Sequence, residues 1–288
     1  MKKVLVFGGS GFLGNYLVNE LISCNYDVTV ADVKKSSDSA KFVYCDILKI
    51  PDLKKVFLKK FEFVYNLAGF ANLEDAINDP ILTMELNLVA NMHIAELCIK
   101  HNVSKYVFAS SAYAMSEKGS FYGISKLASE KSIEEYHKKK GLDFVIIRYG
   151  SVYSEKPFDN NYIFNLIKKS ISTGIIDHNG DGQEYREYIH ALDAAKLSVE
   201  ILESNQFLNK HVVLTGSQGI KRIDLFNMIN EIMGNKLKIN LIKDNESDHY
   251  KFTPYSFQAS ISKKLVPNPQ IDLGQGILET IRYVHKKH

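Results

Sequence analysis

The chain has 288 residues, of which 45% are hydrophobic and 24% are charged, a composition typical of globular proteins with one large or two modest domains. Its formal net charge of +3 is too small to predict nucleic-acid binding. The sequence contains no run approaching the roughly 20 apolar residues that a membrane span needs, so no membrane partner is expected either.

The first predicted strand, residues 4–7, is a continuous apolar run, as expected of a strand buried on both faces of a parallel sheet. Gly8, Gly11 and Gly14 follow it in G-x-x-G-x-x-G spacing, and a periodic helix begins near Leu13. A strand, a glycine turn and a helix in this order are the context of a dinucleotide-binding fingerprint. Gly8 permits the tight turn, Gly11 lets the backbone approach a pyrophosphate, and Gly14 lets the helix pack against the strand.

Asp32 ends the second predicted strand, residues 27–32. A carboxylate at this position accepts hydrogen bonds from both adenosine ribose hydroxyls and repels a 2′-phosphate, which favours NAD over NADP. Lys34 and Lys35 follow directly and weaken this preference. The alternative is that Asp32 is simply a turn residue at the end of a strand.

The next segments continue the alternation of strands and helices. Strands are predicted at residues 41–45, 63–67, 106–109 and 144–148, and helices after Pro51, at 81–101 and at 122–140. This order predicts a doubly wound parallel sheet with right-handed crossovers. Ser110 and Ser111 follow the fifth strand, at the edge where open α/β sheets bind ligands.

Tyr122 and Lys126 lie four residues apart in the predicted helix at 122–140, so they share one face of it. A fixed ammonium beside a phenol favours the phenolate and lowers the pKa of the phenol from about 10, which makes Tyr122 a candidate acid or base. Alone, such a pair is more often a half-buried ring and a solvated charge. Its significance depends on the glycine turn and the serines.

After Arg148 the elements become smaller and more mixed. Helices are predicted at 162–172, 191–202, 223–233 and 274–285, and strands at 184–189, 211–214 and 237–242, the strand at 211–214 joining the main sheet. This pattern predicts an NAD-binding Rossmann domain at 1–150, with about 190–216 added to it, and a smaller C-terminal substrate-binding lobe at 151–288. We expect the site in the cleft between them.

Together, these residues resemble the extended short-chain dehydrogenase/reductase family, and more narrowly its nucleotide-sugar epimerase/dehydratase group. The resemblance covers nearly the whole chain in the order of the family. The matching positions are Gly8, Gly11, Gly14, Asp32, Asp46, Ile47, 66–68, Asn87, Ser110, Ser111, Tyr122, Lys126, 148–153, 180–190, 260–265 and 273–277.

The resemblance implies an NAD-dependent oxidoreductase that acts at C4 of a nucleotide-activated sugar, as a 4-epimerase or a 4-dehydrogenase. Tyr122 would be the acid or base on a sugar hydroxyl, Lys126 would hold the nicotinamide ribose, and Ser111 would hydrogen-bond the reacting oxygen. Hydride would pass between the sugar carbon and the nicotinamide. Arg186 would bind the diphosphate, a task suited to its fork of donors, unless it forms an ion pair with Glu184 or Glu187.

The resemblance also implies the cofactor contacts, a substrate contact at Ser151 and an assembly. The NAD contacts are Gly8, Ser10, Gly11, Phe12, Leu13, Gly14, Asp32, Asp46, Ile47, Leu67, Ala68, Gly69, Asn87, Tyr122, Lys126 and Tyr149. The partner is a nucleotide-diphosphate sugar. The long helices at 81–101 and 122–140 match a pair that forms a two-fold interface in related enzymes, so a homodimer is expected.

Departures from the family pattern bear on the reaction. Ala112 and Tyr113 replace the Asp-Glu pair of 4,6-dehydratases, and their lack of an extra acid and base argues against dehydration. Ser151 replaces a substrate-side asparagine. An NAD(P)-dependent 4-ketosugar reductase and a non-catalytic dinucleotide-binding redox sensor are the alternatives, although such sensors often lack the Tyr/Lys pair.

The cysteines indicate the compartment. Cys24, Cys45 and Cys98 are widely spaced and form no C-x-x-C motif. This pattern favours a reduced, cytoplasmic protein without disulfides or a metal site. The Lys- and Asn-rich composition suggests a bacterial surface-polysaccharide pathway.

Overall fold

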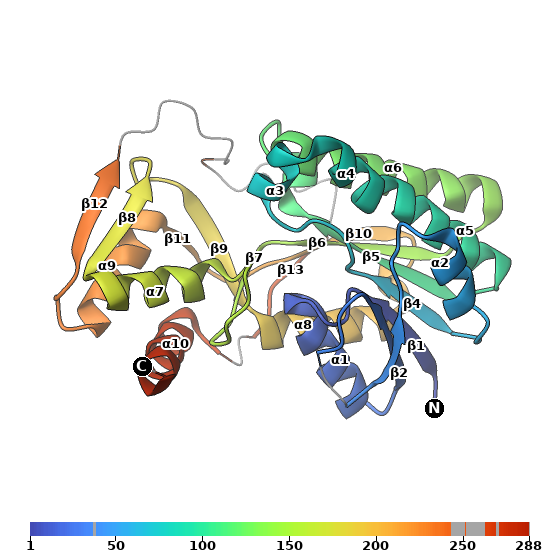
Figure 1. Ribbon diagram of the computed structural model, residues 1–288, viewed down its shortest axis with the longest axis horizontal. Helices are drawn as coiled ribbons and strands as arrows, with labels where there is room; N and C mark the ends of the chain where they lie inside the picture. Colours follow the sequence, from blue (N-terminus) through green and yellow to red (C-terminus); the bar gives the residue numbers. More distant parts are fainter. Residues whose placement is uncertain (37–38, 243–250, 252–262, 269–270, 288) are drawn as a thin grey trace.

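The computed structural model describes residues 1–36, 39–242, 251, 263–268 and 271–287. An eight-stranded sheet, parallel throughout, organises the larger part of the molecule (Figure 1). Its strands are β1 (Lys3–Phe7), β2 (Asp27–Asp32), β3 (Lys41–Tyr44), β4 (Phe63–Asn66), β5 (Lys105–Ser111), β6 (Phe144–Tyr149), β10 (Lys210–Leu214) and β13 (Lys263–Leu265). The spatial order is β13-β10-β6-β5-β4-β1-β2-β3, which confirms the predicted doubly wound parallel sheet.

Strand β1 lies at the centre of this order and pairs with β2 on one side and β4 on the other. Val4 and Val6 are fully buried in the core on one face of the sheet, and Leu5 and Phe7 are fully buried in the core on the other. This is the two-sided burial that the apolar run at 4–7 predicted. The strand order reverses between β1 and β4, and open α/β sheets bind ligands at such a reversal.

Helices cover both faces of the sheet (Figure 1). Helices α1 (Phe12–Ser23) and α8 (Ala191–Glu203) pack on one face, where Leu17 and Val199 belong to the same core. Helices α2 (Ile50–Val56), α5 (Ala90–Lys100) and α6 (Ser120–Lys140) cover the other face. No helix in the described part of the chain has the length and apolar character needed to span a bilayer.

The prediction of a single helix at 81–101 is wrong in detail. The segment begins with α4 (Pro80–Met84), widens into a π-helical turn, η1 (Glu85–Val89), and continues as α5. Asn87 lies in the π-helical turn, where its carbonyl oxygen accepts a hydrogen bond from Ser129 Oγ at 2.7 Å. Its side chain donates to the Phe70 carbonyl at 3.3 Å and to Ser125 Oγ at 3.0 Å. These contacts pair the backbone carbonyl and the side-chain amide nitrogen of Asn87, whereas its Oδ1 has no partner among the described residues.

A smaller lobe follows β6 and lies beside the carboxyl ends of the strands (Figure 1). Its strands are β7 (Ser151–Tyr153), β8 (Ile175–Asn179), β9 (Tyr185–His190), β11 (Gly219–Lys221) and β12 (Lys238–Ile242), and its helices are α7 (Tyr162–Thr173), α9 (Arg222–Ile232) and α10 (Leu273–Lys287). They form a β11-β9-β7 sheet, a β12-β8 pair and a separate apolar core. Strands β7, β8 and β11 were not predicted.

Strand β10 joins the large sheet beside β6, as predicted, and β13 pairs with its other edge. The segment 263–265, which the sequence assigned to the small lobe, therefore adds a strand to the large sheet. Residues 260–262 of the same predicted motif lie outside the described residues. We propose a division into a domain at 1–150 with about 190–216, to which β13 adds residues 263–265, and a lobe formed by the rest of 151–288.

Candidate active site

A cavity of about 750 Å³ opens at the carboxyl ends of the parallel strands, where the small lobe faces the large sheet. It lies where the sequence predicted a cleft. The predicted site residues that line it are Gly8, Ser10, Gly11, Phe12, Leu13, Gly14, Asp32, Asp46, Ile47, Leu67, Ala68, Gly69, Ser111, Tyr122, Lys126, Tyr149, Ser151 and Arg186. Asn87 is the one predicted site residue that does not line it.

The glycine turn after β1 leaves no room for side chains. Gly8 adopts a φ of +73°, and a Cβ there would lie 2.6 Å from the Ala68 backbone nitrogen. A Cβ on Gly14 would overlap the Gly8 carbonyl oxygen, so α1 approaches β1 only because this residue is glycine. The turn therefore holds the N-terminus of α1 against the cavity, as a pyrophosphate site requires.

Asp32 is tied to the glycine turn. Its Oδ2 accepts a hydrogen bond from the Ser10 backbone N–H at 3.0 Å, and its Oδ1 accepts one from the Lys34 backbone N–H at 3.3 Å. The Ser10 hydroxyl is buried and has no partner among the described residues. A buried hydroxyl without a partner beside a glycine turn fits a site that a polar ligand completes.

The loop after β4 is supported from below by a buried polar network. Asn66 Oδ1 accepts a hydrogen bond from the Ala68 backbone N–H at 3.2 Å. Its amide nitrogen donates to Asn91 Oδ1 and to the Tyr106 hydroxyl, both at 3.1 Å. Because Asn87 contacts the adjoining Phe70 carbonyl, it too supports this loop from behind.

Tyr122 and Lys126 lie in the first turns of α6 and face the cavity together, and Ser111 ends β5 beside them. Lys126 Nζ donates to the Ala109 carbonyl at 3.0 Å and lies 5.8 Å from the centre of the Tyr122 ring. Ser111 Oγ accepts a hydrogen bond from the Tyr113 backbone N–H at 3.3 Å. The three predicted catalytic side chains thus share one wall of one cavity.

Burial sets the charge state of Lys126. The side chain is 5% exposed, and desolvation lowers the pKa of its ammonium to about 8, against the opposing effect of the Glu130 carboxylate one turn away. A pKa near 8 keeps Lys126 charged at neutral pH while leaving it sensitive to mildly alkaline conditions.

Glu130 anchors α6 through an ion pair that the sequence analysis missed. Arg148 Nε and Nη2 donate to its two carboxylate oxygens at 2.8 and 2.6 Å, and Ser110 Oγ donates to one of them at 2.5 Å. Burial opposes its charge, yet the hydrogen bonds from Arg148 and His211 hold the pKa of Glu130 at about 2. The carboxylate therefore joins α6 to β5, β6 and β10 directly beneath the candidate catalytic residues.

Tyr149 and Arg186, two further predicted contacts, each form a hydrogen bond with another part of the protein. The Tyr149 hydroxyl is paired with Ser198 Oγ at 2.8 Å, and burial raises the pKa of this phenol. Arg186 is 3% exposed, and its Nη1 donates to the Tyr185 carbonyl at 2.8 Å.

Glu184 and Glu187, the carboxylates considered as alternative partners of Arg186, contact other side chains. Glu184 pairs with His178 at 3.1 Å, and Glu187 pairs with Lys264 at 2.8 Å. Arg186 lines the cavity, and both neighbouring carboxylates contact other side chains.

Tyr162, Tyr188 and Arg222 also line the cavity, although the sequence analysis did not single them out. Tyr188 lies two residues beyond Arg186 on β9, so strand alternation could have placed it on the same face. Tyr162 and Arg222 begin α7 and α9, and no local motif indicated that these two helix starts meet at the cavity.

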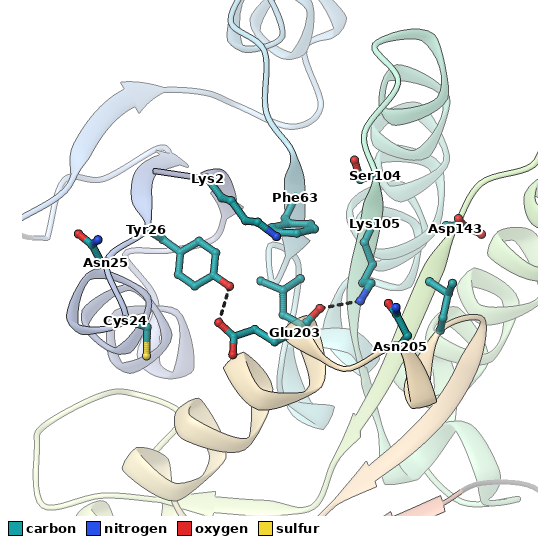
Figure 2. Close-up of a pocket in the computed structure, with 12 residues that line it drawn as sticks. Lys2, Cys24, Asn25, Tyr26, Phe63, Ser104, Lys105, Asp143, Glu203 and Asn205 are labelled. Carbon is teal, nitrogen blue, oxygen red and sulfur yellow. Dashed lines mark hydrogen bonds between the residues drawn. The ribbon is translucent and has the colours of Figure 1, made fainter.

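A second cavity, of about 530 Å³, lies at the amino ends of the strands and contains none of the predicted site residues (Figure 2). Two of its polar side chains pair with other groups of its wall. The Tyr26 hydroxyl donates to Glu203 at 2.8 Å, and Lys105 Nζ donates to the Leu202 carbonyl at 2.6 Å. Burial lowers the pKa of Lys105. Lys105 thus caps the C-terminal end of α8, a structural role.

The described residues include no group of three or more His, Cys, Asp or Glu side chains that could hold a metal ion.

Comparison with known proteins adds the family. Residues 4–215 match the model of the NAD dependent epimerase/dehydratase family. The chain is 27% identical over 305 aligned residues to a protein of Methanocaldococcus jannaschii, with 98% of each chain covered. It is 24% identical over 326 aligned residues to the UDP-glucose 4-epimerase of Lacticaseibacillus casei, covering 99% of this chain and 97% of that one.

A solved structure shares the fold. The UDP-glucuronic acid 4-epimerase of Bacillus cereus, solved with UDP-glucuronic acid and NAD, superimposes with a TM-score of 0.85 at 22% identity, covering 99% of this chain and 100% of that one. The family model spans the glycine turn, Asp32 and the Tyr122/Lys126 pair. The chain belongs to the NAD dependent epimerase/dehydratase family, and NAD is its cofactor.

Proposed function

We propose that this enzyme is an NAD-dependent 4-epimerase of a UDP-activated sugar. The observation that carries the proposal is the meeting of Tyr122, Lys126 and Ser111 on one wall of the cavity that the glycine turn also lines. Relatives named as UDP-glucose and UDP-glucuronate 4-epimerases support C4 as the reacting position. Residues of the small lobe, including Arg186, close the opposite side of the cavity.

NAD would be held by the residues that the sequence predicted for it. The glycine turn presents the N-terminus of α1 to the pyrophosphate, and Asp32 accepts the adenosine ribose hydroxyls. The loop at 67–69, supported by Asn66, lets the backbone lie against the cofactor. Bound NAD supplies reversible hydride transfer.

The protein's own task is to move one proton. Tyr122 removes the proton from the sugar 4-hydroxyl as hydride leaves C4, and returns it when hydride comes back on the other face. The Lys126 ammonium favours the phenolate that this step needs. Ser111 Oγ donates a hydrogen bond to the same sugar oxygen and stabilises the charge that develops on it.

Side chains around Ser111 disfavour dehydration. Ala112 and Tyr113 follow it, and neither supplies the second acid and base that expelling water requires. Tyr113 instead packs edge-on against Tyr122, with 5.9 Å between ring centres. The remaining alternatives, a net 4-dehydrogenase or a 4-ketosugar reductase, differ from an epimerase in the redox state of the released cofactor.

The decisive experiment incubates purified protein with UDP-glucose or UDP-glucuronic acid and separates the nucleotide sugars chromatographically. An epimerase forms the C4 epimer without net NADH. Net NADH would assign a dehydrogenase, and consumption of added NADH by a 4-keto sugar would assign a reductase. No conversion of any nucleotide sugar, with NAD bound, would favour the redox sensor.

We also propose a homodimer formed by α4, α5 and α6. These helices expose a group of large apolar side chains to solvent: Ile81, Val89, Met92, Phe121, Ile124 and Leu127. A second copy packing helix against helix would cover them. Multi-angle light scattering should give twice the chain mass; a monomer at micromolar concentration would contradict this proposal.

We also propose a cytoplasmic location and a role in surface-polysaccharide synthesis. All three cysteines are free thiols, with Cys24 exposed and Cys45 and Cys98 buried, which suits a reducing compartment. A UDP-sugar epimerase supplies activated sugars to glycosyl transfer, which polysaccharide synthesis consumes.

A further inference from the structure

The small-lobe wall of the cavity carries a guanidinium besides Arg186. Arg222 is the first residue of α9, and its backbone N–H donates to the Glu184 carbonyl at 2.9 Å. Arg186 lies two residues beyond Glu184, on strand β9, which pairs with the β11 strand that precedes Arg222. Both arginines line the cavity.

The Arg222 guanidinium is held by an aromatic ring rather than by an acid. Its central carbon lies 4.0 Å from the centre of the Tyr162 ring, the closest cation–ring contact in the described part of the chain. No carboxylate of a described residue lies within ion-pair distance of it. The stacking fixes the plane of the guanidinium, and the Glu184 carboxylate favours its charge from beyond ion-pair distance.

Two buried donors at this position lack partners. Arg222 Nε and the Tyr188 hydroxyl are both shielded from solvent, and neither has a hydrogen-bond partner among the described residues. Tyr188 is only 8% exposed, and it lines the same cavity as Arg222. Leaving a buried donor unpaired is unfavourable, so a ligand that pairs both would be strongly favoured.

We propose that Arg222 and Tyr188 bind a phosphate oxygen of the nucleotide sugar, so that Arg222 and Arg186 together hold its diphosphate. This inference rests on the proposed function and adds to it the residues that select a diphosphate. Two separate guanidinium groups can each pair with one phosphate group of a diphosphate, whereas a monophosphate offers only one phosphate group to the two of them.

The test compares the binding of UDP, UMP and uridine to Arg222→Gln and to the native protein by calorimetry, with NAD present. Arg222→Gln should weaken UDP binding about 10- to 100-fold and UMP binding less, and should leave NAD affinity unchanged. Tyr188→Phe, which removes only the hydroxyl, should weaken UDP binding about tenfold. Lys221→Gln, at the exposed neighbouring residue outside the cavity, removes the same charge and should change nothing.

The outcomes separate this inference from the proposed function. Native binding of UDP together with equal UDP affinity in Arg222→Gln would overturn the inference alone. A selective loss of UDP affinity without any epimerisation by the native protein would support the inference and overturn the proposed function. A native protein that binds no nucleoside diphosphate would overturn both. A folding defect in Arg222→Gln would appear as lost NAD binding, in which case Arg222→Lys, which keeps the charge but lacks Nε, decides by the same UDP measurement.

Discussion

Replacing Glu130 by Gln should strongly destabilise the fold, although this side chain does not line the candidate active site. The substitution keeps the shape of the side chain but removes the charge that faces Arg148. Both side chains are at most 4% exposed, so the guanidinium would be left buried without its counter-ion. Removing one partner of a buried ion pair typically costs about 3–5 kcal/mol.

The pKa of Glu130 leads to a similar magnitude. Its pKa is lowered from 4.5 to about 2, which corresponds to about 3 kcal/mol of favourable interaction with the ionised form. Because a lowered carboxyl pKa stabilises the fold only when the group is ionised, this contribution is complete above pH 4.5. It is lost as the pH falls from 4.5 towards 2.

Urea unfolding at pH 7, followed by circular dichroism, measures the effect. Glu130→Gln should lower the free energy of unfolding by about 3–5 kcal/mol. Glu135→Gln is the matched control, since Glu135 lies on the same helix and pairs with Lys138 at 2.8 Å in full exposure to solvent. That variant should unfold like the native protein.

A second substitution distinguishes the buried charge from general damage to the helix. Arg148→Met in the Glu130→Gln background removes the unpaired guanidinium, and we expect it to restore at least half of the lost stability. The explanation would be refuted if Glu130→Gln lost no more stability than the Glu135 control, or if Arg148→Met made the double variant less stable still.

Three further predictions concern the active site. Tyr122→Phe should lower turnover about 10²- to 10⁴-fold and leave NAD binding by calorimetry intact; turnover within a factor of ten of the native rate would exclude Tyr122 as the acid/base. Gly14→Ala should weaken NAD binding at least tenfold, because its methyl group would overlap the Gly8 carbonyl, and unchanged affinity would exclude this explanation. Turnover should fall as the pH rises through about 8, because Lys126 then loses the charge that favours the phenolate; a rate that is flat from pH 7 to 9 would contradict this.

The sequence predicted the large sheet well because each of its central strands is buried on both faces. Residues 4–7 and 144–147 are continuous apolar runs, which are typical of strands in a parallel sheet that helices cover on both faces. The short strands at 175–179 and 219–221 have three to five residues and mixed exposure, so no periodicity marked them. Their pairing depends on contacts between segments distant in sequence, which a local pattern does not contain.

The site residues also divide into those marked by a local motif and those whose role depends on distant segments. The glycine turn, Asp32 and the Tyr122/Lys126 pair are local motifs, and each could be read from its spacing. Glu130 and Arg222 could not, because their significance comes from partners elsewhere in the chain, Arg148 for one and Tyr162 for the other. A buried glutamate and a surface glutamate look alike in a helix that is mostly polar.

Strand β13 has a consequence for how the protein is made. It pairs with β10, and the Thr215 backbone N–H donates to the Leu265 carbonyl at 3.3 Å, so one edge of the large sheet is completed by residues near the C-terminal end. A ribosome releases the glycine turn and the whole of α6 well before this strand emerges. The nucleotide-binding half of the sheet can therefore assemble during synthesis, while the β10 edge stays open to other chains until β13 has emerged.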